Sequence, residues 1–303
     1  MIHDELAASV LLAPPEPASA VLVRSSPGNG GENWIGSPSA VRVGDEIFLA
    51  YRLRETGRRG YAVEIAKSAD GVSFETLVTI TKEQMDAESL ERPELVLTSD
   101  GTWRLYLSCA THGTKHWRVE LIESASPDAF DPATRRVVLP GDSANAVKDP
   151  VIVHHEGGWH LWASVHPLAE PDHTDRMTTN YATSADGVEW TWHGTALSPR
   201  PGEWDARGVR VAAVKFSTDG IMAYYDGRAT AEQNCEEMTG IAMGTGPGMM
   251  TAVGAEPVAQ SKHAGYGLRY VTVVDLGDGY ERLYYELTNE RGSHDLVTEL
   301  RLA

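Results

Sequence analysis

Cysteine is scarce in this sequence, and its scarcity excludes a class of folds. The 303 residues include only two cysteines, Cys109 and Cys235, which are far apart and form no C-x-x-C pair. Two isolated cysteines cannot supply the disulfide framework of a small secreted scaffold. Both thiols are therefore expected to stay reduced, and stability must come from a packed core.

Positive charge is also in short supply. Lys and Arg number 26 against 43 Asp and Glu, which gives a formal net charge of -17. A chain this acidic repels phosphate backbones, so we expect no nucleic-acid partner. The remaining composition, with 42% hydrophobic and 23% charged residues, is typical of a globular protein.

Long hydrophobic runs and nucleotide-binding motifs are missing as well. The apolar stretch Ala7–Ala13 is too short to span a bilayer and contains Ser9. The first 17 residues lack the basic start and cleavage site of a signal peptide. There is no G-x-G-x-x-G fingerprint, P-loop or G-x-S-x-G motif. We therefore expect no membrane partner, no cofactor and a cytoplasmic location.

An internal repeat is present. The sequence Ser-Ala-Asp-Gly-Val occurs at residues 68–72 and again at 184–188, each time followed one residue later by an aromatic residue. The copies lie 116 residues apart, or two units of 58, and a degenerate copy at 124–130 lies between them. A repeat of this length is typical of propellers, solenoids and similar arrays.

Five β-prone runs confirm the period of the repeat. They begin 56, 56, 62 and 60 residues apart, at residues 47, 103, 159, 221 and 281. Each run follows a Gly-Asp, Asp-Gly or Gly-Gly pair, and another apolar run precedes that pair. Such pairs tolerate the positive φ of a tight hairpin. Each unit therefore predicts four antiparallel strands.

These units predict an all-β fold, a single five-bladed β-propeller domain over residues 1–303. The expected blades are residues 34–85, 91–140, 147–198, 207–256 and 268–302, with residues 10–25 supplying a ring-closing strand and residues 296–302 as its competitor. Blades must stack radially, because one sheet cannot bury both of its faces alone. A two-sheet sandwich is the alternative, but it generates no repeat of this length.

In a propeller the first strand of each blade lines the central channel, so charged residues entering those strands are candidates for a site. Burying charge is costly unless the charge is paired or used. The carboxylates selected as catalytic candidates are Asp149, Glu91, Glu94 and Asp205. The second strands end near the same mouth and add Asp226 and Glu286. The candidates for substrate binding are Trp34, Ser37, Arg92, Arg207, Arg210, Asp226, Arg269 and Glu286.

The blade-opening x-Pro pairs and the Ser-x-Asp-Gly turns resemble those of the five-bladed propeller glycosidases, glycoside hydrolase families 32, 43, 62, 68 and their relatives. The pairs are Ser37-Pro38, Arg92-Pro93 and Asp149-Pro150. The resemblance covers the whole length of the chain as architecture. It implies a small-molecule or oligosaccharide substrate in the central pocket.

The resemblance also implies roles for three positions. Asp149 matches the Asp that tunes the pKa of the catalytic acid in family 43. Ser37 stands where that family has its general base, and Arg207 stands where it has the Glu of its general acid. Replacement carboxylates lie nearby, so Glu91 with Asp149, or Asp149 with Asp205, could divide the acid and base work of glycoside cleavage.

Other residues have both a structural and a functional interpretation. Arg207, Arg210 and Arg269 could pair with the carboxylates of the channel or form an anion site for phosphate or carboxylate groups. Trp34 could be a sugar-stacking platform or part of a blade core. No protein-only metal site is predicted, although a channel histidine could hold a divalent ion. The polar loop Leu168–Met177 could cover the mouth or be a plain solvent loop.

Three hypotheses of function remain open. The first is a glycoside hydrolase-like enzyme acting on a glycoside or furanoside. The second is a non-hydrolytic propeller enzyme that performs elimination, transfer or rearrangement on a sugar-bearing metabolite. The third is a non-catalytic carbohydrate-binding propeller. A hydrolase requires two facing carboxyl groups about 5–10 Å apart, whereas a binding protein requires a shallow aromatic surface.

Overall fold

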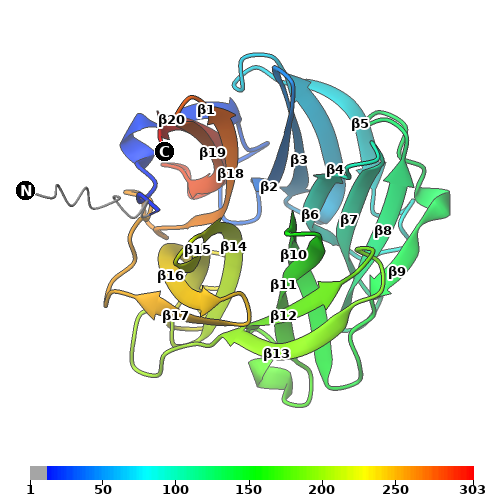
Figure 1. Ribbon diagram of the computed structural model, residues 1–303. Helices are drawn as coiled ribbons and strands as arrows, with labels where there is room; N and C mark the ends of the chain where they lie inside the picture. Colours follow the sequence, from blue (N-terminus) through cyan, green and yellow to red (C-terminus); the bar gives the residue numbers. More distant parts are fainter. Residues whose placement is uncertain (1–11) are drawn as a thin grey trace, which may run out of the picture.

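The computed structural model describes residues 12–303, and its regular secondary structure is almost entirely β-strand (Figure 1). Three antiparallel sheets have four strands each and follow the chain in order. They comprise β6 (Leu90–Leu97), β7 (Trp103–Ala110), β8 (Trp117–Ser124) and β9 (Arg136–Leu139); β10 (Asn145–His155), β11 (Gly158–Pro167), β12 (Thr178–Ser184) and β13 (Thr191–Leu197); and β14 (Gly208–Ser217), β15 (Gly220–Arg228), β16 (Met238–Gly246) and β17 (Met249–Val253).

The remaining strands form an eight-stranded sheet made of two four-stranded runs. One run is β2 (Trp34–Val43), β3 (Glu46–Glu55), β4 (Arg58–Ser68) and β5 (Glu75–Thr81), and the other is β18 (Leu268–Gly277), β19 (Tyr280–Thr288), β20 (His294–Leu302) and β1 (Val21–Arg24). A single parallel bridge between Trp34 and His294 joins the two runs. The prediction of an all-β fold with four-stranded antiparallel sheets is confirmed.

The sheets lie radially around a common centre. In Figure 1 the first strand of each four-stranded run, namely β2, β6, β10, β14 and β18, lies innermost. Each of these strands contacts the next around the ring, and β18 contacts β2. Residues near the starts of these strands are therefore brought together although they lie far apart in sequence.

Both strands proposed for closing the ring take part in one sheet. β1 pairs antiparallel with β20, so the N-terminal strand adds a fourth member to the run that ends the chain. The predicted closing segment 10–25 begins with residues 10 and 11, which lie outside the described residues. The two predicted competitors are thus neighbours.

The repeated Ser-x-Asp-Gly motif builds a turn, as its composition indicates. In the first copy, Ser68 Oγ accepts from Gly71 N at 2.9 Å, while Asp70 Oδ1 accepts from Val72 N and Ser73 N at 2.8 and 2.7 Å. The second copy, at Ser184, repeats this pattern. Gly71 has a φ of +74°, a backbone conformation that glycine adopts without steric cost.

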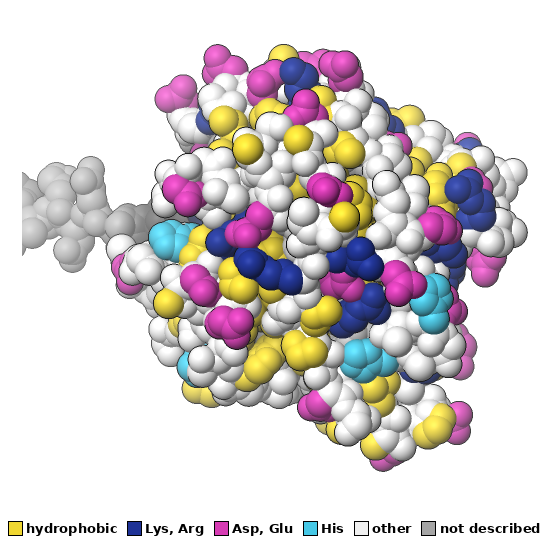
Figure 2. All heavy atoms as spheres, turned by 90° about the vertical axis from the view of Figure 1, so that its right-hand side faces the viewer, with side chains coloured by type: hydrophobic (Ala, Val, Ile, Leu, Met, Phe, Trp, Pro, Cys, Tyr) yellow, Lys and Arg dark blue, Asp and Glu magenta, His cyan; other side chains and the backbone are white. Residues whose placement is uncertain are grey.

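Apolar side chains fill the spaces between neighbouring sheets and form separate clusters around the ring. Short 3₁₀ helices, at Pro17–Ser19, Pro132–Thr134 and Pro171–His173, are the helical elements of the described chain. Among residues 12–303, no helix has the length and apolar character needed to cross a membrane. On the side shown in Figure 2, Lys and Arg side chains lie beside Asp and Glu side chains rather than forming a region of one sign.

Candidate functional site

A β-bulge interrupts the first strand of every four-stranded run. The pairing register shifts after Gly36, Leu90, Lys148, Val211 and Arg269. A bulge bends a strand and re-aims a side chain, which is why bulges occur next to active sites. Ser37, Asp149 and Tyr270 each follow such a shift and share a positive φ of 52°, 53° and 58°. Ser37 and Asp149 therefore occupy equivalent positions, as the sequence comparison of the two blades predicts.

Asp149 is fully buried, and its two carboxylate oxygens differ in their hydrogen bonding. Its Oδ2 accepts from Lys148 Nζ at 3.1 Å and from Arg210 Nη1 at 3.2 Å. Its Oδ1 has no hydrogen-bond partner among the described residues. Burial alone would raise the pKa of Asp149, but Lys148 and Arg210 outweigh it and lower that pKa to about 2. Asp149 is therefore an ionised acceptor at neutral pH.

His166 lies beside Asp149 and is held neutral. Its Nδ1 donates to the carbonyl of Thr174 at 3.1 Å, which leaves Nε2 as an acceptor with no partner among the described residues. Burial lowers the pKa of His166 to about 3, and the Lys148 charge acts in the same direction. The hydroxyl of Ser164, whose residue pairs with Lys148 across the sheet, is likewise buried without a partner in the described chain. Unpaired buried polar groups thus gather around Asp149.

A chain of buried ion pairs crosses the channel from Glu91 to Glu286. Arg52 bonds to Glu91 and places its other terminal nitrogen 2.8 Å from Glu286 Oε2. Arg269 bonds to Glu286 Oε1 at 2.6 and 2.8 Å and to Glu237 at 2.8 Å. The nearby guanidinium groups hold the pKa of Glu286 well below its usual range despite burial. Glu286 therefore remains charged and bound within the protein.

Glycine at position 36 allows Glu286 to approach the first inner strand. A Cβ built on Gly36 would lie 2.2 Å from Glu286 Oε2, which is a severe clash. Glu286 Oε2 instead accepts from the backbone N–H of Ser37 at 3.1 Å. A carboxylate of β19 therefore lies against the position at which the resembling family carries its own carboxylate.

Arg210 links Asp149 to a second carboxylate. It donates to Asp226 Oδ2 through Nε at 3.0 Å and Nη2 at 2.8 Å, besides its contact with Asp149. The ring of Tyr270 lies 3.8 Å from the Arg210 guanidinium carbon, and the Tyr270 N–H donates to both oxygens of Asp226. Both Asp226 oxygens are thus occupied by protein donors.

Two more predicted residues lie deeper in the channel. Arg92 and Glu94 line a cavity of about 350 Å³ together with residues from the middle of the inner strands. Arg92 donates to the carbonyl of Ala212 at 2.8 Å and lies 3.5 Å from Glu94 Oε2. Burial raises the pKa of Glu94. The prediction of a charged channel holds here, but these two groups lie outside the hydrogen-bonding set of Asp149.

Asp205 requires a correction, because it does not join Asp149. Its carboxylate accepts from Arg200 Nε at 2.9 and 3.0 Å and from the Tyr225 hydroxyl at 2.8 Å. Arg200 in turn donates to Gly254, just after the outer strand β17. The segment before β14 therefore turns Asp205 into the body of its own sheet, and a pair of Asp149 with Asp205 is not formed.

The structure also decides between the two interpretations of Trp34, a sugar-stacking platform or part of a blade core. Trp34 is 3% exposed, and its ring stacks on His294 with centroids 5.1 Å apart. The Arg54 guanidinium carbon lies 4.1 Å from the Trp34 ring. With these neighbours Trp34 offers no open ring face, so the platform prediction is wrong for this conformation and the core interpretation holds.

The three arginines named as a possible anion site are all bound to carboxylates. Arg207 bonds to Asp175 at 2.6 and 2.8 Å, while Arg210 and Arg269 bond to the buried carboxylates already described. Their structural interpretation, as carboxylate partners, is the one observed. Arg54 differs from them, since it has no ion-pair partner among the described residues.

The loop Leu168–Met177 covers His166. Leu168 N donates to Ala144 O at 2.7 Å, and the Thr174 carbonyl accepts from His166. Asp175 is held by Arg207 from the next sheet, and Arg228 also bonds to the Asp175 carbonyl. The loop is therefore bonded to both neighbouring sheets, and its position over the channel mouth stays a prediction.

The residues present do not fit a metal ion. Within residues 12–303 there is no group of three or more His, Cys, Asp and Glu side chains arranged to hold one. His166 and Asp149 lie close enough to influence each other's pKa, and Lys148 places a positive charge beside both. A divalent cation would be repelled at that position.

Some residues of the site were missed in the sequence. Glu237 accepts hydrogen bonds from Arg228 and Arg269, and it directly precedes β16 in the sequence. Nothing in the repeat marks it, because the loop before β16 differs in each unit. Lys148 carried a usable signal, since it directly precedes Asp149 at the entrance of an inner strand.

The comparisons with known proteins concern the fold. No protein-family model matches the chain, and no curated protein matches it. Among solved structures, it is similar to a thermostable family-43 glycoside hydrolase at 15% identity and a TM-score of 0.69, covering 91% of this chain and 92% of that one. It is similar to a β-1,2-mannobiose phosphorylase from Listeria innocua at 16% identity and 0.66, covering 94% of each. An arabinanase from Bacillus subtilis aligns at 14% identity and 0.62, covering 91% and 97%.

This chain therefore has the fold of the propeller glycosidases, as the resemblance in its sequence indicated. At sequence identities of 14–16%, the similarity to these structures establishes the fold but not the activity.

Proposed function

We propose that this protein is a carbohydrate-active enzyme that cleaves or transfers a glycosidic group at Asp149. One observation carries the proposal: buried hydrogen-bond acceptors without a protein partner converge on that residue. They are Asp149 Oδ1 and the Nε2 of the neutral His166. An unpaired buried polar group costs about 1–3 kcal/mol, so a fold that keeps several in one place keeps them for a ligand.

The kind of atom left unpaired defines the kind of ligand. A carboxylate oxygen and an imidazole nitrogen both accept hydrogen bonds, so their ligand must donate. The hydroxyl of Ser164 can accept as well as donate. Sugars present several hydroxyl donors around one ring, and this complementarity supports a carbohydrate substrate.

The lowered pKa of Asp149 supports a role as a fixed negative charge in the reaction. A carboxylate that stays ionised at neutral pH can stabilise the positive charge that develops on the sugar ring, whereas its low basicity makes it a poor proton acceptor. It cannot supply a proton to the leaving oxygen. Glu91, whose pKa is lowered by Arg52 and Lys148, is in the same state. The charge of Asp149 acts on the pKa of Glu91, so the two carboxyl groups stay candidates for a pair, but neither is protonated at neutral pH.

Transfer to an anionic acceptor such as phosphate is a second candidate. Burial lowers the pKa of Arg54, and that guanidinium has no carboxylate partner in the described chain. Arg59 and Lys148 lie over the ring of Trp117, at 5.5 and 5.0 Å from its centroid. These cations at the mouth would favour an acceptor that carries negative charge.

We further propose that the five four-stranded runs are the five blades of one propeller domain. The cyclic contacts of β2, β6, β10, β14 and β18 support this count. A cytoplasmic location remains part of the proposal, and the two free cysteines are consistent with it.

The test is a release assay on nitrophenyl furanosides and pyranosides, with and without inorganic phosphate. Wild type is compared with Asp149→Asn and with Asp205→Asn, which neutralises an equally buried carboxylate outside the site. We expect turnover to fall about 100-fold or more in Asp149→Asn and to change little in Asp205→Asn. Release that requires phosphate supports transfer, and release without phosphate supports hydrolysis. No release by wild type from any sugar, or equal losses in both variants, would contradict the proposal.

A further inference from the structure

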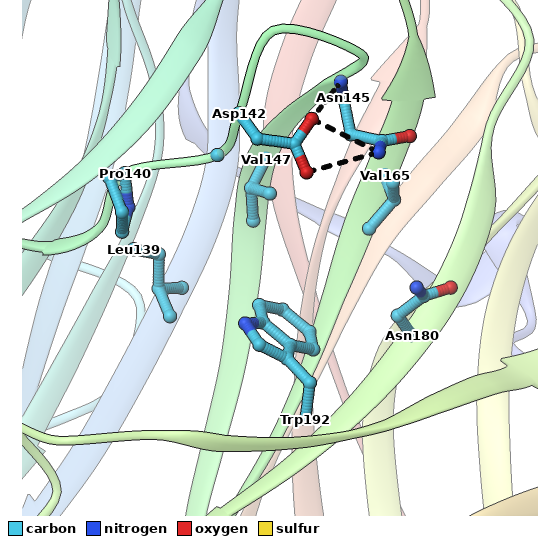
Figure 3. A pocket seen from close by; sticks show the side chains of 9 residues that line it. Leu139, Pro140, Asp142, Asn145, Val147, Val165, Asn180 and Trp192 are labelled. Carbon is cyan, nitrogen blue, oxygen red and sulfur yellow. Dashed lines mark hydrogen bonds between the residues drawn. The ribbon is translucent and has the colours of Figure 1, made fainter.

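A cavity separate from the channel lies between the sheets β6–β9 and β10–β13. It has a volume of about 340 Å³, at the lower end of the range of ligand pockets. Its floor is apolar, with Leu139, Val147 and Val165. Figure 3 shows Trp192 on one side, Asn180 on another, and Asp142 with Asn145 above, all around one shared space.

Trp192 is an unusual residue for its position. It lies near the start of the outer strand β13, where five successive residues are exposed, and its side chain is 40% exposed. Exposing a large aromatic ring beside a hollow favours contact with a ligand, because the ring face buries apolar surface at low entropic cost. Its indole N–H donates to no described protein group.

The polar groups around Trp192 are held in place by other bonds. Asn180 Oδ1 accepts from the hydroxyls of Thr178 and Thr195 at 3.2 and 3.1 Å, so the orientation of its amide is fixed with the NH₂ group still available. Asp142 Oδ1 accepts from Ala144 N and Asn145 N at 2.7 Å each, and the Asn145 amide also donates to Asp142. The cavity therefore presents pre-oriented donors and acceptors beside an aromatic face.

A second cavity continues the first one along the rim. It has a volume of about 270 Å³ and shares Asn145 and Val165 with the first. It reaches Arg176 and Met177 in the loop that covers His166, and Arg207 beside that loop. Together the two cavities extend from Trp192 toward the loop that covers His166.

We propose that this pair of cavities is a peripheral groove that binds an oligosaccharide chain, with Trp192 as its aromatic anchor. The inference rests on the proposed function, since it assumes that the protein acts on carbohydrate. An aromatic face suits the C–H face of a sugar ring, and the amides of Asn180 and Asn145 with the carboxylate of Asp142 suit its hydroxyl groups. The groove would hold units of a chain whose reacting unit enters the channel.

The experiment is affinity electrophoresis of the folded protein in gels containing soluble arabinan, xylan or mannan. The variants are Trp192→Ala and Asn180→Ala, and the control is Tyr280→Ala, which removes an aromatic side chain of similar exposure, 46%, outside the groove. We expect retardation of wild type by at least one polysaccharide. Binding should weaken about tenfold in Trp192→Ala, equivalent to about 1.4 kcal/mol, and stay unchanged in the control.

Two outcomes overturn the inference: wild type retarded by none of the polysaccharides, or retarded as strongly when Trp192 or Asn180 is removed. The same variants are assayed on nitrophenyl monosaccharides, which are too short to reach the groove from the channel. Unchanged turnover there, with lost polysaccharide binding, supports the groove. Absence of all turnover combined with Trp192-dependent retardation would refute the enzymatic proposal and leave the groove standing.

Discussion

Glu286→Gln is the substitution that should most directly reveal the cost of the buried charges. The change keeps the shape of the side chain and removes its charge. Glu286 accepts from Arg52 at 2.8 Å, from Arg269 at 2.6 and 2.8 Å, and from His294 at 2.6 Å, and its side chain is fully buried. A glutamine amide would direct N–H donors at groups that are themselves donors.

The magnitude follows from the burial. Removing one partner of a buried ion pair costs about 3–5 kcal/mol, because the remaining charge cannot reach water. Glu123→Gln provides a matched control, since Glu123 also pairs with two arginines, Arg104 at 2.9 Å and Arg136 at 2.6 Å, but is 33% exposed. Exposed pairs contribute about 0–1 kcal/mol. We therefore expect Glu286→Gln to destabilise the protein by about 4 kcal/mol and the control by less than about 1 kcal/mol.

The assay is equilibrium urea unfolding followed by tryptophan fluorescence, with the free energy of unfolding extrapolated to water. A loss of this size is a large part of the 5–15 kcal/mol typical of a domain, yet it leaves a folded protein to measure. If the two variants differed by less than about 1 kcal/mol, burial would not govern the strength of these pairs. The electrostatic account of the channel would then fail.

Two further predictions concern His166 and Arg207. The pKa of His166 is lowered from 6.5 to about 3 in the folded protein. Between these two pH values the imidazole is protonated in the unfolded state and neutral in the folded state. The free energy of unfolding should therefore fall as the pH drops through this range, by up to about 1.4 kcal/mol per pH unit. Unfolding measured from pH 7 to pH 4 should therefore show a shallower decline in His166→Gln than in wild type, and parallel curves would refute the assignment. Arg207→Met should free the loop Leu168–Met177 and raise amide hydrogen exchange there several-fold, whereas Arg58→Met, which removes an exposed pair with Glu55, should not. Equal exchange of the loop in both variants would show that Arg207 does not hold it.

The sequence was sufficient for the strands because their signal is local and repeated. Asp-Gly pairs, alternating β-prone runs and the two copies of Ser-Ala-Asp-Gly-Val mark hairpins without any knowledge of the partner sheets. The alignment of Ser37 with Asp149 also came from the x-Pro pattern, and the shared bulge gives it a physical basis.

The error at Trp34 shows where local reasoning stops. The hairpin turn pairs Val43 with Glu46, and an uninterrupted count along both strands would place Glu55 opposite Trp34. The bulge after Gly36 shifts the register by one residue and brings Arg54 there instead. Arg54 then covers the ring on this strand pair, and His294 stacks on it from β20, so neither contact could be read from the pattern of one strand.

The error at Asp205 has a different origin. Asp205 was expected in the channel because it is close in sequence to an inner strand. The segment before β14 instead makes a turn in which the Asp205 carboxylate accepts from Arg200 and Tyr225. Which arginine binds which carboxylate depends on distances between sheets. No pattern within a single unit contains that information.

In three of the five inner strands, the bulge holds one residue in the same left-handed backbone conformation. Serine, aspartate and tyrosine occupy these three positions, at 37, 149 and 270, with φ values between 52° and 58°. The same local backbone conformation thus carries an alcohol, an acid or a phenol at equivalent places in the ring. A scaffold of this kind can vary the functional group at such a position while keeping the backbone conformation that presents it.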